Sequence, residues 1–460
     1  MNNIQKAAVS LALVAAAGCS SFLNSDDAID NPNAPTRATR DQLLVAVQAG
    51  IWGLHESGVA QTACMWVQAC SGVGGRFVEA RGTNYTRLSA DYRADFAGVY
   101  TGSGLLDLRN IQAGAEADGD LVYRGVAKVL EAMLIGFAAD AWGDIPYSDA
   151  VGDNPTPAFD GQLEIYAALQ TLLTGAIADL NAEGAGPGAF DLAYGGDKAK
   201  WTELANTLKA RYFLHTAEGA TRGTFNTAAY QSAITAANAG ISTPANDYRA
   251  IHSAPTSERN IWFQFTETTF GQDLVPGFFL VELMKQRNDP RLSEYFVPNS
   301  EGGYGGNDVN SVVPASQISS FAGAPRFDPL FAQPLVTWDE NQLILAEARF
   351  QTGGGGAAAA PHVNAVRARH GLPPLAPAQV TLQAIMEEKY VALFQNPEVW
   401  SDYKRTCFPV LDPAGSNDEI PGRVLYGDSE LNANPNTPSV ADQNSRNGGR
   451  NPNDPTPCTP

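Results

Sequence analysis

The five histidines are the side chains best suited to bind a metal ion or to transfer protons near neutral pH. No two of them have the H-E-x-x-H spacing that places two imidazoles and a general base on one helix face. The sequence also lacks the G-x-S-x-G nucleophile turn and the phosphate-binding G-x-x-x-x-G-K-[ST] loop. We therefore interpret all five as surface residues or hydrogen-bonded core residues: His55, His215, His252, His362 and His370.

Two other patterns imitate a binding loop and fail. Residues 179–184 (Asp-x-Asn-x-Glu-Gly) follow the first half of a calcium-binding loop, but position twelve is Phe190, where a bidentate Glu is required. Four glycines at 353–356 lack the Lys-Ser/Thr of a phosphate loop, so we interpret them as a solvated linker. A glycosidase acid pair is defined by the separation of two carboxyl groups, which a sequence does not give. We expect no catalytic residue, no metal and no cofactor.

The remaining possibility is that the protein recognises a ligand through side chains on its surface. Sugars present apolar C–H faces and many hydroxyl groups, so their sites combine exposed aromatic platforms with polar and basic side chains, and peptide sites use similar means. Aromatic and basic residues in irregular stretches are the best candidates, because those on helix faces pack into the core. The candidate ligand-binding residues are Trp66, Arg76, Phe77, Tyr85, Trp262, Phe270 and Tyr304. The tryptophans on or next to predicted helices are expected to be structural: Trp52, Trp142, Trp201, Trp338 and Trp400.

The composition is that of a folded protein, since 44% of the 460 residues are hydrophobic and 17% are charged. The formal net charge is -19. This charge argues against nucleic-acid binding, which needs a basic surface to displace counterions from phosphates. It also argues against a membrane association that depends on electrostatic attraction alone.

The N-terminal residues have the pattern of a targeting segment. Lys6 precedes an apolar stretch at 7–17 that is too short to span a bilayer, and residues 16–19 read AAGC. This sequence resembles a bacterial lipobox, with Ala16 where such boxes usually carry Leu. It predicts a signal peptide at 1–18 and lipidation of Cys19; a plain secretory signal is the alternative. The polar residues 19–40 predict a flexible lipidated tether.

Four cysteines remain after Cys19, and an even number in an exported chain indicates disulfides. Three pairings are possible. We favour Cys64 with Cys70, which lie close in sequence, and Cys407 with Cys458, which would tie down a Pro- and Asn-rich tail. Zinc is the rival reading of four cysteines, but their spacing contains no C-x-x-C knuckle.

Apolar residues recur at steps of three and four along most of the chain, which predicts helices. One is a core helix that begins after Asp120 and ends before Gly143 and Pro146. Further helices are predicted at 41–55, 105–117, 160–180, 201–216, 278–286, 339–351, 362–370 and 382–394. We expect one domain at 41–460, with helical parts at 41–242 and 335–411, a loop-rich insert at 243–334, and an irregular tail at 412–460.

Several motifs are similar to those of one family. Residues 141–150 read AWGDIPYSDA, and residues 196–211 read GDKAKWTELANTLKAR. The series continues in order with NDPRL at 288–292, AEA at 346–348, VRARHG at 366–371, PEVWSDYKRT at 397–406 and IPGRVLY at 420–426. On these motifs, which span 120–434, the chain resembles the SusD/RagB family, outer-membrane lipoproteins that bind nutrients for import through a partner barrel.

The resemblance implies a mostly α fold, in which tetratricopeptide-like helix pairs form an α-solenoid scaffold with a loop-rich insert. It implies a lipid-anchored, surface-exposed protein of the bacterial outer membrane that is not an enzyme. Such a protein binds nutrient ligands, glycans or oligosaccharides first among them, and delivers them to a TonB-dependent SusC-like barrel. The alternatives are a peptide-binding RagB-like importer subunit, a helical-repeat scaffold that binds only proteins, and an enzyme acting on exported glycans.

Overall fold

The computed structural model describes residues 38–74, 85, 88–219, 221–268, 271–445, 450–451 and 454–458. The predicted signal peptide, Cys19 and most of the tether lie outside the described residues. Three candidate ligand-binding residues, Arg76, Phe77 and Phe270, lie outside them as well. Within the described parts the chain is mostly helical, as the sequence predicts, and its strands are three or four residues long.

Helix α7 (Leu121–Trp142) is the predicted core helix, and it is buried along most of its length. Asp120 caps its first turn, because the carboxylate accepts a hydrogen bond from the backbone N–H of Tyr123 at 3.1 Å. Gly136 lies against Tyr212 of α9 (Lys198–His215), where an added Cβ would be 2.1 Å from the tyrosine hydroxyl. Glycine at this position therefore permits the close packing of α7 and α9.

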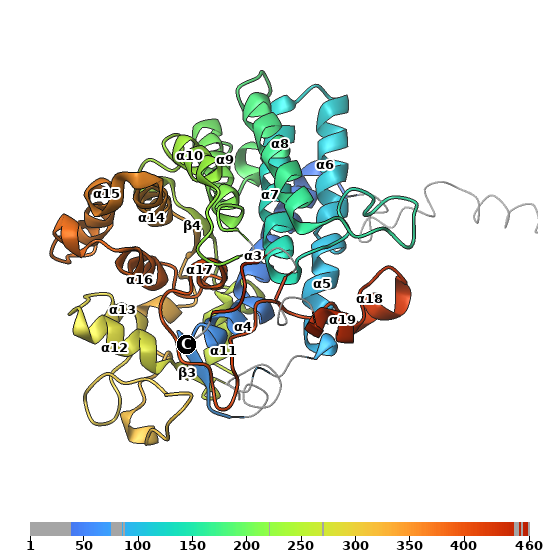
Figure 1. Ribbon diagram of the computed structural model, residues 1–460. Coiled ribbons are helices and arrows are strands. Elements are labelled where there is room, and N and C mark those ends of the chain that lie inside the picture. The colour runs from blue at the N-terminus through green and yellow to red at the C-terminus, as the bar shows by residue number, and fades with distance from the viewer. Residues whose placement is uncertain are drawn as a thin grey trace, which may run out of the picture.

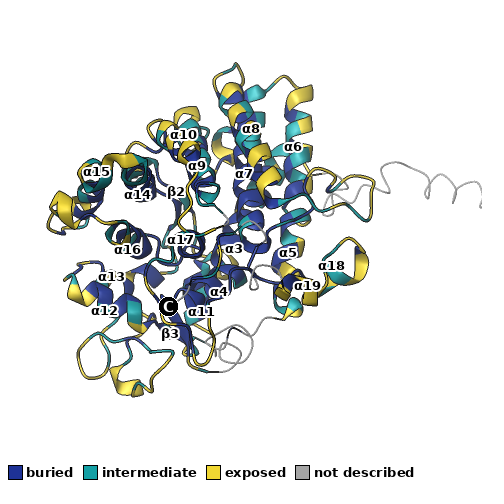
Figure 2. Ribbon diagram, viewed as in Figure 1, coloured by how far each residue is buried: buried dark blue, intermediate teal, exposed yellow. Residues whose placement is uncertain are grey.

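Consecutive helices pack in pairs around this centre (Figure 1). Helices α6 (Leu105–Ala117) and α8 (Gln162–Leu180) flank α7, α9 packs with α10 (Thr227–Ala237), and α14 (Trp338–Arg349) packs with α15 (Gly355–Arg369). Figure 1 shows these pairs following one another in an arc from α6 to α15. Figure 2 shows that the pairs bury one face and expose the other, which is how a solenoid of helix pairs builds a continuous core.

The sequence pattern predicts the ends of most longer helices within a few residues, predicts the start of α15 at 362 where it lies at Gly355, and misses several shorter helices. Helices α3 (Arg40–Glu56) and α16 (Leu382–Ala392) are confirmed, whereas α4 (Gly58–Trp66), α5 (Arg93–Tyr100), α10 and α17 (Glu398–Thr406) are not predicted. The linker predicted at 353–356 is wrong. The chain turns at Gly353, whose φ is 93°, and α15 already begins at Gly355, so the alanine run that follows is helical.

The insert at 243–334 contains short strands and helices that its Gly- and Pro-rich composition does not predict. Strand β1 (Cys70–Gly72) pairs antiparallel with β3 (Leu274–Pro276), and β2 (Tyr248–Ala250) pairs antiparallel with β4 (Gln333–Val336). Helix α12 (Phe278–Gln286) has the predicted bounds, and α11 (Ile261–Thr266) and α13 (Leu292–Tyr295) are short additions. The strands β1 to β4 are too short to show the alternation of apolar and polar residues by which a strand is recognised in a sequence.

Short turns connect the longer elements along the whole described chain. The 3₁₀ turns are Ser89–Tyr92, Gly188–Phe190, Pro244–Asn246, Thr256–Glu258, Ala315–Gln317, Pro325–Phe327 and Pro377–Gln379, and a π-type turn occupies Phe350–Gly354.

The two disulfides are the pairs that the sequence favours. Cys64–Cys70 closes the connection between α4 and β1. Cys407–Cys458 joins the end of α17 to the last described residues.

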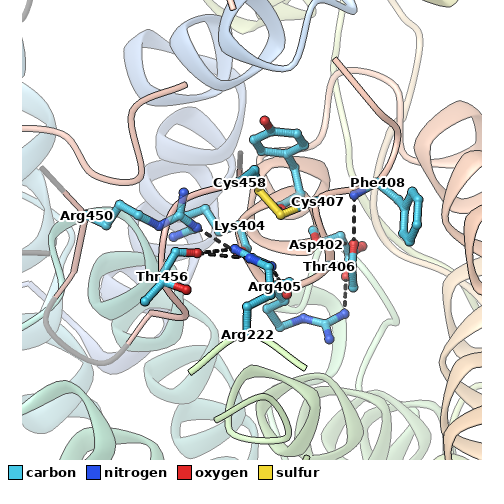
Figure 3. The surroundings of a disulfide bond; sticks show 11 residues. Arg222, Asp402, Lys404, Arg405, Thr406, Cys407, Phe408, Arg450, Thr456 and Cys458 are labelled. Carbon is cyan, nitrogen blue, oxygen red and sulfur yellow. Dashed lines mark hydrogen bonds and ion pairs between the residues drawn. A yellow bond between two sulfur atoms is a disulfide. The ribbon is translucent and has the colours of Figure 1, made fainter. Parts of the chain in front are cut away.

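Hydrogen bonds hold the C-terminal tail beside the second disulfide (Figure 3). Figure 3 shows Arg222 and Arg450 directed at the last turn of α17, where they donate to the carbonyls of Arg405 (3.0 Å) and Lys404 (2.7 Å). The tail also contains two short helices, α18 (Asp428–Ala433) and α19 (Val440–Ser445), and α18 lies beside α5. The segment at 412–460 is therefore less irregular than its Pro and Asn content predicts.

Candidate ligand-binding face

The ribbon formed by β1 and β3 supports one face of the molecule. Its strands pair Cys70 with Pro276 and Gly72 with Leu274, and the Val73 N–H donates to the Asp273 carbonyl at 2.8 Å. The Cys64–Cys70 disulfide ties the ribbon to α4.

The insert adds a third segment to this ribbon. Asn307 donates its backbone N–H to the Pro276 carbonyl at 2.8 Å and accepts from the Phe278 N–H at 3.0 Å. Its side-chain amide donates to the Ser71 hydroxyl at 2.8 Å, which fixes the segment to β1. Gly306 permits this close approach, because an added Cβ there would be 2.4 Å from the Gly277 carbonyl oxygen.

The tail closes the same face. The Asn310 amide donates to Asp412 Oδ2 at 2.9 Å and to the Pro413 carbonyl at 3.1 Å, and its oxygen accepts from the Gly415 N–H at 2.7 Å. Asn310 and Asp412 are exposed, so the polar groups of this junction reach solvent. We call the surface formed by the β1–β3 ribbon, residues 304–310 and residues 412–415 the loop face.

A pocket of about 280 Å³ opens next to the loop face, at the start of α12. Phe278 is 43% exposed there, and Val410 stands opposite it at 60% exposed. The remaining apolar lining is Phe279 and Leu283, and the polar lining is Glu282, Gln286, Gln383 and Glu387. An exposed aromatic ring surrounded by carboxylate and amide groups suits a sugar, which offers C–H faces and hydroxyl groups together. We call this site the Phe278 pocket.

Phe278 is not among the ligand-binding residues predicted from the sequence, although the helix pattern around it contains a signal for exposure. Residues 278–286 were predicted to be a helix, and its core side is filled by Leu280, Val281, Leu283 and Met284. Phe278 at the first position lies outside that stripe, so one bulky ring had to face outward.

Three of the predicted ligand-binding residues are buried in the interior. Trp66 and Trp262 are 0% exposed, and Tyr85 is 8% exposed. Trp66 ends α4 and packs its ring against Trp400 at 5.2 Å, while Trp262 lies on α11. The prediction that these rings are exposed platforms is wrong, because the stretches that contain both tryptophans are helical.

Tyr304 is partly exposed at the loop face, which leaves it as a candidate contact. Tyr85 also reaches this part of the molecule, but its hydroxyl accepts the Ala414 N–H at 2.9 Å and so supports the tail. The five tryptophans expected to be structural are buried or pack against the core: Trp52, Trp142, Trp201, Trp338 and Trp400.

The best acid–base pair in the described chain lies in the interior. His215 Nε2 is 2.9 Å from Glu398 Oε1. Burial lowers the pKa of His215 to about 4 and raises the pKa of Glu398 to about 7. The void beside this pair is about 20 Å³, which is room for about one water molecule and not for a substrate. No group of three or more His, Cys, Asp or Glu side chains in the described parts is placed to hold a metal ion.

The geometry defines a helical-repeat scaffold that carries a surface pocket beside a loop face. A family model described as "Starch-binding associating with outer membrane" matches residues 32–372, and the SusD family model matches residues 340–453. The chain belongs to the SusD/RagB family. No protein with a curated description matches its sequence.

Solved structures share the fold. A chitin-binding protein is 22% identical with a TM-score of 0.72, over 91% of this chain and 99% of that one. A chitin-binding SusD homologue from Flavobacterium johnsoniae is 18% identical with a TM-score of 0.72, over 91% and 96% of the two chains. A SusD homologue from Bacteroides fragilis is 20% identical with a TM-score of 0.69, over 92% and 99%. At these identities the likeness concerns the fold.

Proposed function

We propose that the protein is a surface lipoprotein of the bacterial outer membrane that binds a glycan nutrient and delivers it to a TonB-dependent, SusC-like barrel. The observation that carries the proposal is the exposed Phe278 ring within a rim of Glu and Gln side chains next to the loop face. Tyr304 and, from outside the described residues, Arg76, Phe77 and Phe270 are proposed as further contacts. No catalytic residue is proposed.

Membership of the SusD/RagB family supports a nutrient at the outer membrane, because the matching family model is described as starch-binding and associated with that membrane. Two structures of the same fold are described as chitin-binding, which favours a glycan over a peptide. We propose attachment through a lipid on Cys19, with residues 19–40 as the tether. Acyl chains contribute about 0.8 kcal/mol per buried methylene, so two or three chains hold a protein of any surface charge.

A binding test begins with an array of neutral oligosaccharides, including chito- and malto-oligosaccharides, and of peptides. The best binder is then titrated calorimetrically into the full mature protein and into Phe278→Ala. Loss of one stacked ring, at about 1 kcal/mol or somewhat more, should weaken binding about five- to tenfold.

Phe190→Ala is the matched control, because Phe190 is 46% exposed on a different part of the chain. Its affinity should equal that of the wild type. Equal affinities for wild type and Phe278→Ala would place the ligand elsewhere, and binding of peptides alone would favour the RagB-like alternative.

The barrel partner is tested by gentle detergent extraction of native membranes. A tethered binder has no path of its own across the membrane, so the ligand must pass to a channel, and a barrel of roughly twice this protein's mass should co-purify. The pair should bind the ligand more tightly than the lipoprotein alone, since each partner then buries part of it. A lone monomer with full affinity would contradict the proposal.

A further inference from the structure

A second pocket, of about 360 Å³, lies between β2, the end of the insert, α14 and α15. It shares no lining residue with the Phe278 pocket. Four of its lining side chains are arginines, in a chain whose formal net charge is -19. We call it the arginine pocket, after Arg249, Arg291, Arg326 and Arg369.

Arg326 is the arginine without a carboxylate partner. Its Nε donates to Gln395 Oε1 at 2.6 Å and its Nη2 to the Phe394 carbonyl at 2.8 Å, and both acceptors are neutral. The guanidinium carbon lies over the rings of Tyr295 (4.9 Å) and Phe331 (5.3 Å). Ring faces offset part of the cost of burying a cation, and an ion pair would offset more. The third nitrogen, Nη1, has no hydrogen-bond partner in the described parts of the chain.

Burial makes it less favourable for the Arg326 guanidinium to carry its charge. It lowers the pKa of Arg326 below the usual range of a guanidinium, and the neighbouring Arg249 and Arg291 act in the same direction. The exposed Glu294 at the rim acts in the opposite direction, from beyond ion-pair distance. Asp247 and Asp339 in the pocket lining are paired with other cations, and Arg326 forms no ion pair of its own, so a bound anion would supply the counter-charge that this guanidinium lacks.

The pocket walls have a different character, because their charges are already paired. Arg249 Nη2 is 2.7 Å from Asp247 Oδ2, and Arg369 and His370 both contact Asp339 Oδ2. The Arg249 and Arg369 side chains keep 34% and 31% exposure, so further N–H groups face the opening. Alternating N–H donors and carboxylate acceptors suit hydroxyl groups, each of which donates one hydrogen bond and accepts others.

We propose that the arginine pocket binds an acidic sugar, a uronate residue, with its carboxylate on Arg326 and its hydroxyl groups on the paired walls. The volume of about 360 Å³ accommodates a monosaccharide unit and part of a neighbour. A guanidinium meets a carboxylate with parallel N–H groups, which a neutral sugar does not satisfy. The site is independent of the proposed nutrient function at the Phe278 pocket, because no residue is common to both.

The test is calorimetric titration of the full mature protein with glucuronate, glucose, glutamate and acetate. Glucuronate should bind at least tenfold more tightly than glucose and acetate, because it alone offers the carboxylate and the hydroxyl groups together. Arg326→Gln should abolish the glucuronate preference, and Arg249→Gln should weaken glucuronate binding several-fold. Arg259→Gln is the control, since Arg259 is 32% exposed, pairs with Glu267, and does not line the pocket.

Several outcomes would overturn the proposal. If glucose or acetate binds as tightly as glucuronate, the pocket does not select a sugar acid. If glutamate binds more tightly than glucuronate, the pocket is a site for zwitterions. An Arg326→Gln protein that melts like the wild type and still prefers glucuronate would also refute it. If Arg326→Gln does not fold, unchanged affinity in Arg249→Gln has the same force. Phe278→Ala should leave glucuronate binding intact, which separates a failure here from a failure of the proposed nutrient site.

Discussion

Replacing Trp142 by Ala should destabilise the protein without altering its ligand site. Trp142 is 0% exposed and ends α7, inside the AWGDIPYSDA motif. Its ring packs edge-on against Phe96 (5.3 Å) and Phe137 (6.1 Å). Its indole N–H donates to the Leu425 carbonyl at 2.9 Å, which joins the exit of α7 to the tail.

The magnitude follows from these contacts. Deleting a buried aromatic side chain costs about 3 to 5 kcal/mol, which includes the cavity left behind. A separate loss of about 1 to 3 kcal/mol is expected when the Leu425 carbonyl is left without a donor. Trp142→Phe keeps most of the packing and should lose mainly this second part. Together these losses come to about 4 to 8 kcal/mol, which for the roughly 400 described residues lowers the melting temperature by about 5 to 10 °C.

Urea denaturation of wild type, Trp142→Ala and Trp142→Phe measures the free energy of unfolding, with the slope compared between variants. Trp338→Ala is the control, because Trp338 is only partly buried and should lose less. Ligand affinity is measured in parallel at a temperature where all variants are folded. A Trp142→Ala protein with wild-type stability and lost ligand binding would refute the structural role and place the motif in the site.

Two further predictions concern the anchor and the interior. Cys19→Ala should move the protein from the membrane fraction to the soluble fraction, since no other anchor is proposed, and a variant that still sediments with membranes would contradict lipidation. Burial lowers the pKa of His55 from 6.5 to about 4, so the unfolded chain takes up a proton between these pH values that the folded chain does not. Stability should therefore fall as the pH drops from 6.5 towards 4, and His55→Gln should remove about 2 to 3 kcal/mol of the loss between pH 7 and pH 4.5. Urea denaturation at the two pH values measures it, and an identical pH dependence in both proteins would show that burial does not lower the pKa of His55.

The sequence predicts the helices whose apolar residues are large and regularly spaced. Helix α6 has the predicted bounds, and α7 and α8 differ from theirs by a few residues at most. Helix α10 is missed because its core side is mainly Ala, which gives little contrast with its outer side. Helix α17 is missed because it buries charged side chains, such as Arg405 and Asp402, at positions that a pattern search treats as outward-facing.

The site is harder to predict than the fold, because exposure is a property of the packed molecule. Trp66 and Phe278 are both aromatic residues at the end of a short helix, yet one is 0% and the other 43% exposed. The difference comes from what covers them: Trp400 of α17 packs on Trp66, whereas the start of α12 faces a pocket. Trp400 is more than 100 residues from Trp66 in sequence, and the pocket residues Gln383 and Val410 are more than 100 residues from Phe278. No local sequence pattern contains these neighbours.

The motifs that identify the family prove to be one another's structural partners. Arg405 of PEVWSDYKRT donates to both oxygens of Glu347 of AEA, at 2.7 and 3.0 Å, with both side chains buried. Arg291 of NDPRL and Arg367 of VRARHG meet on the same carboxylate, Glu388, at 2.8 and 2.9 Å. Removing one member of such a buried pair would leave the other uncompensated, at a cost of about 3 to 5 kcal/mol. We therefore expect a substitution in one of these motifs to destabilise the fold unless its partner is changed with it.

The difference between buried motif residues and pocket residues explains why the family can be predicted from the sequence and the ligand cannot. Buried charge pairs and capped helices impose fixed residues at fixed spacing, which is what a motif is. The Phe278 pocket imposes much less, because its polar lining residues Glu282 and Gln383 lie on helix surfaces that fold equally well with other polar residues. None of the paired motif residues Glu347, Arg367 and Arg405 lines that pocket. These paired residues stabilise the fold from outside the Phe278 pocket, so we expect substitutions at the rim of that pocket to change what it binds while the fold stays constant.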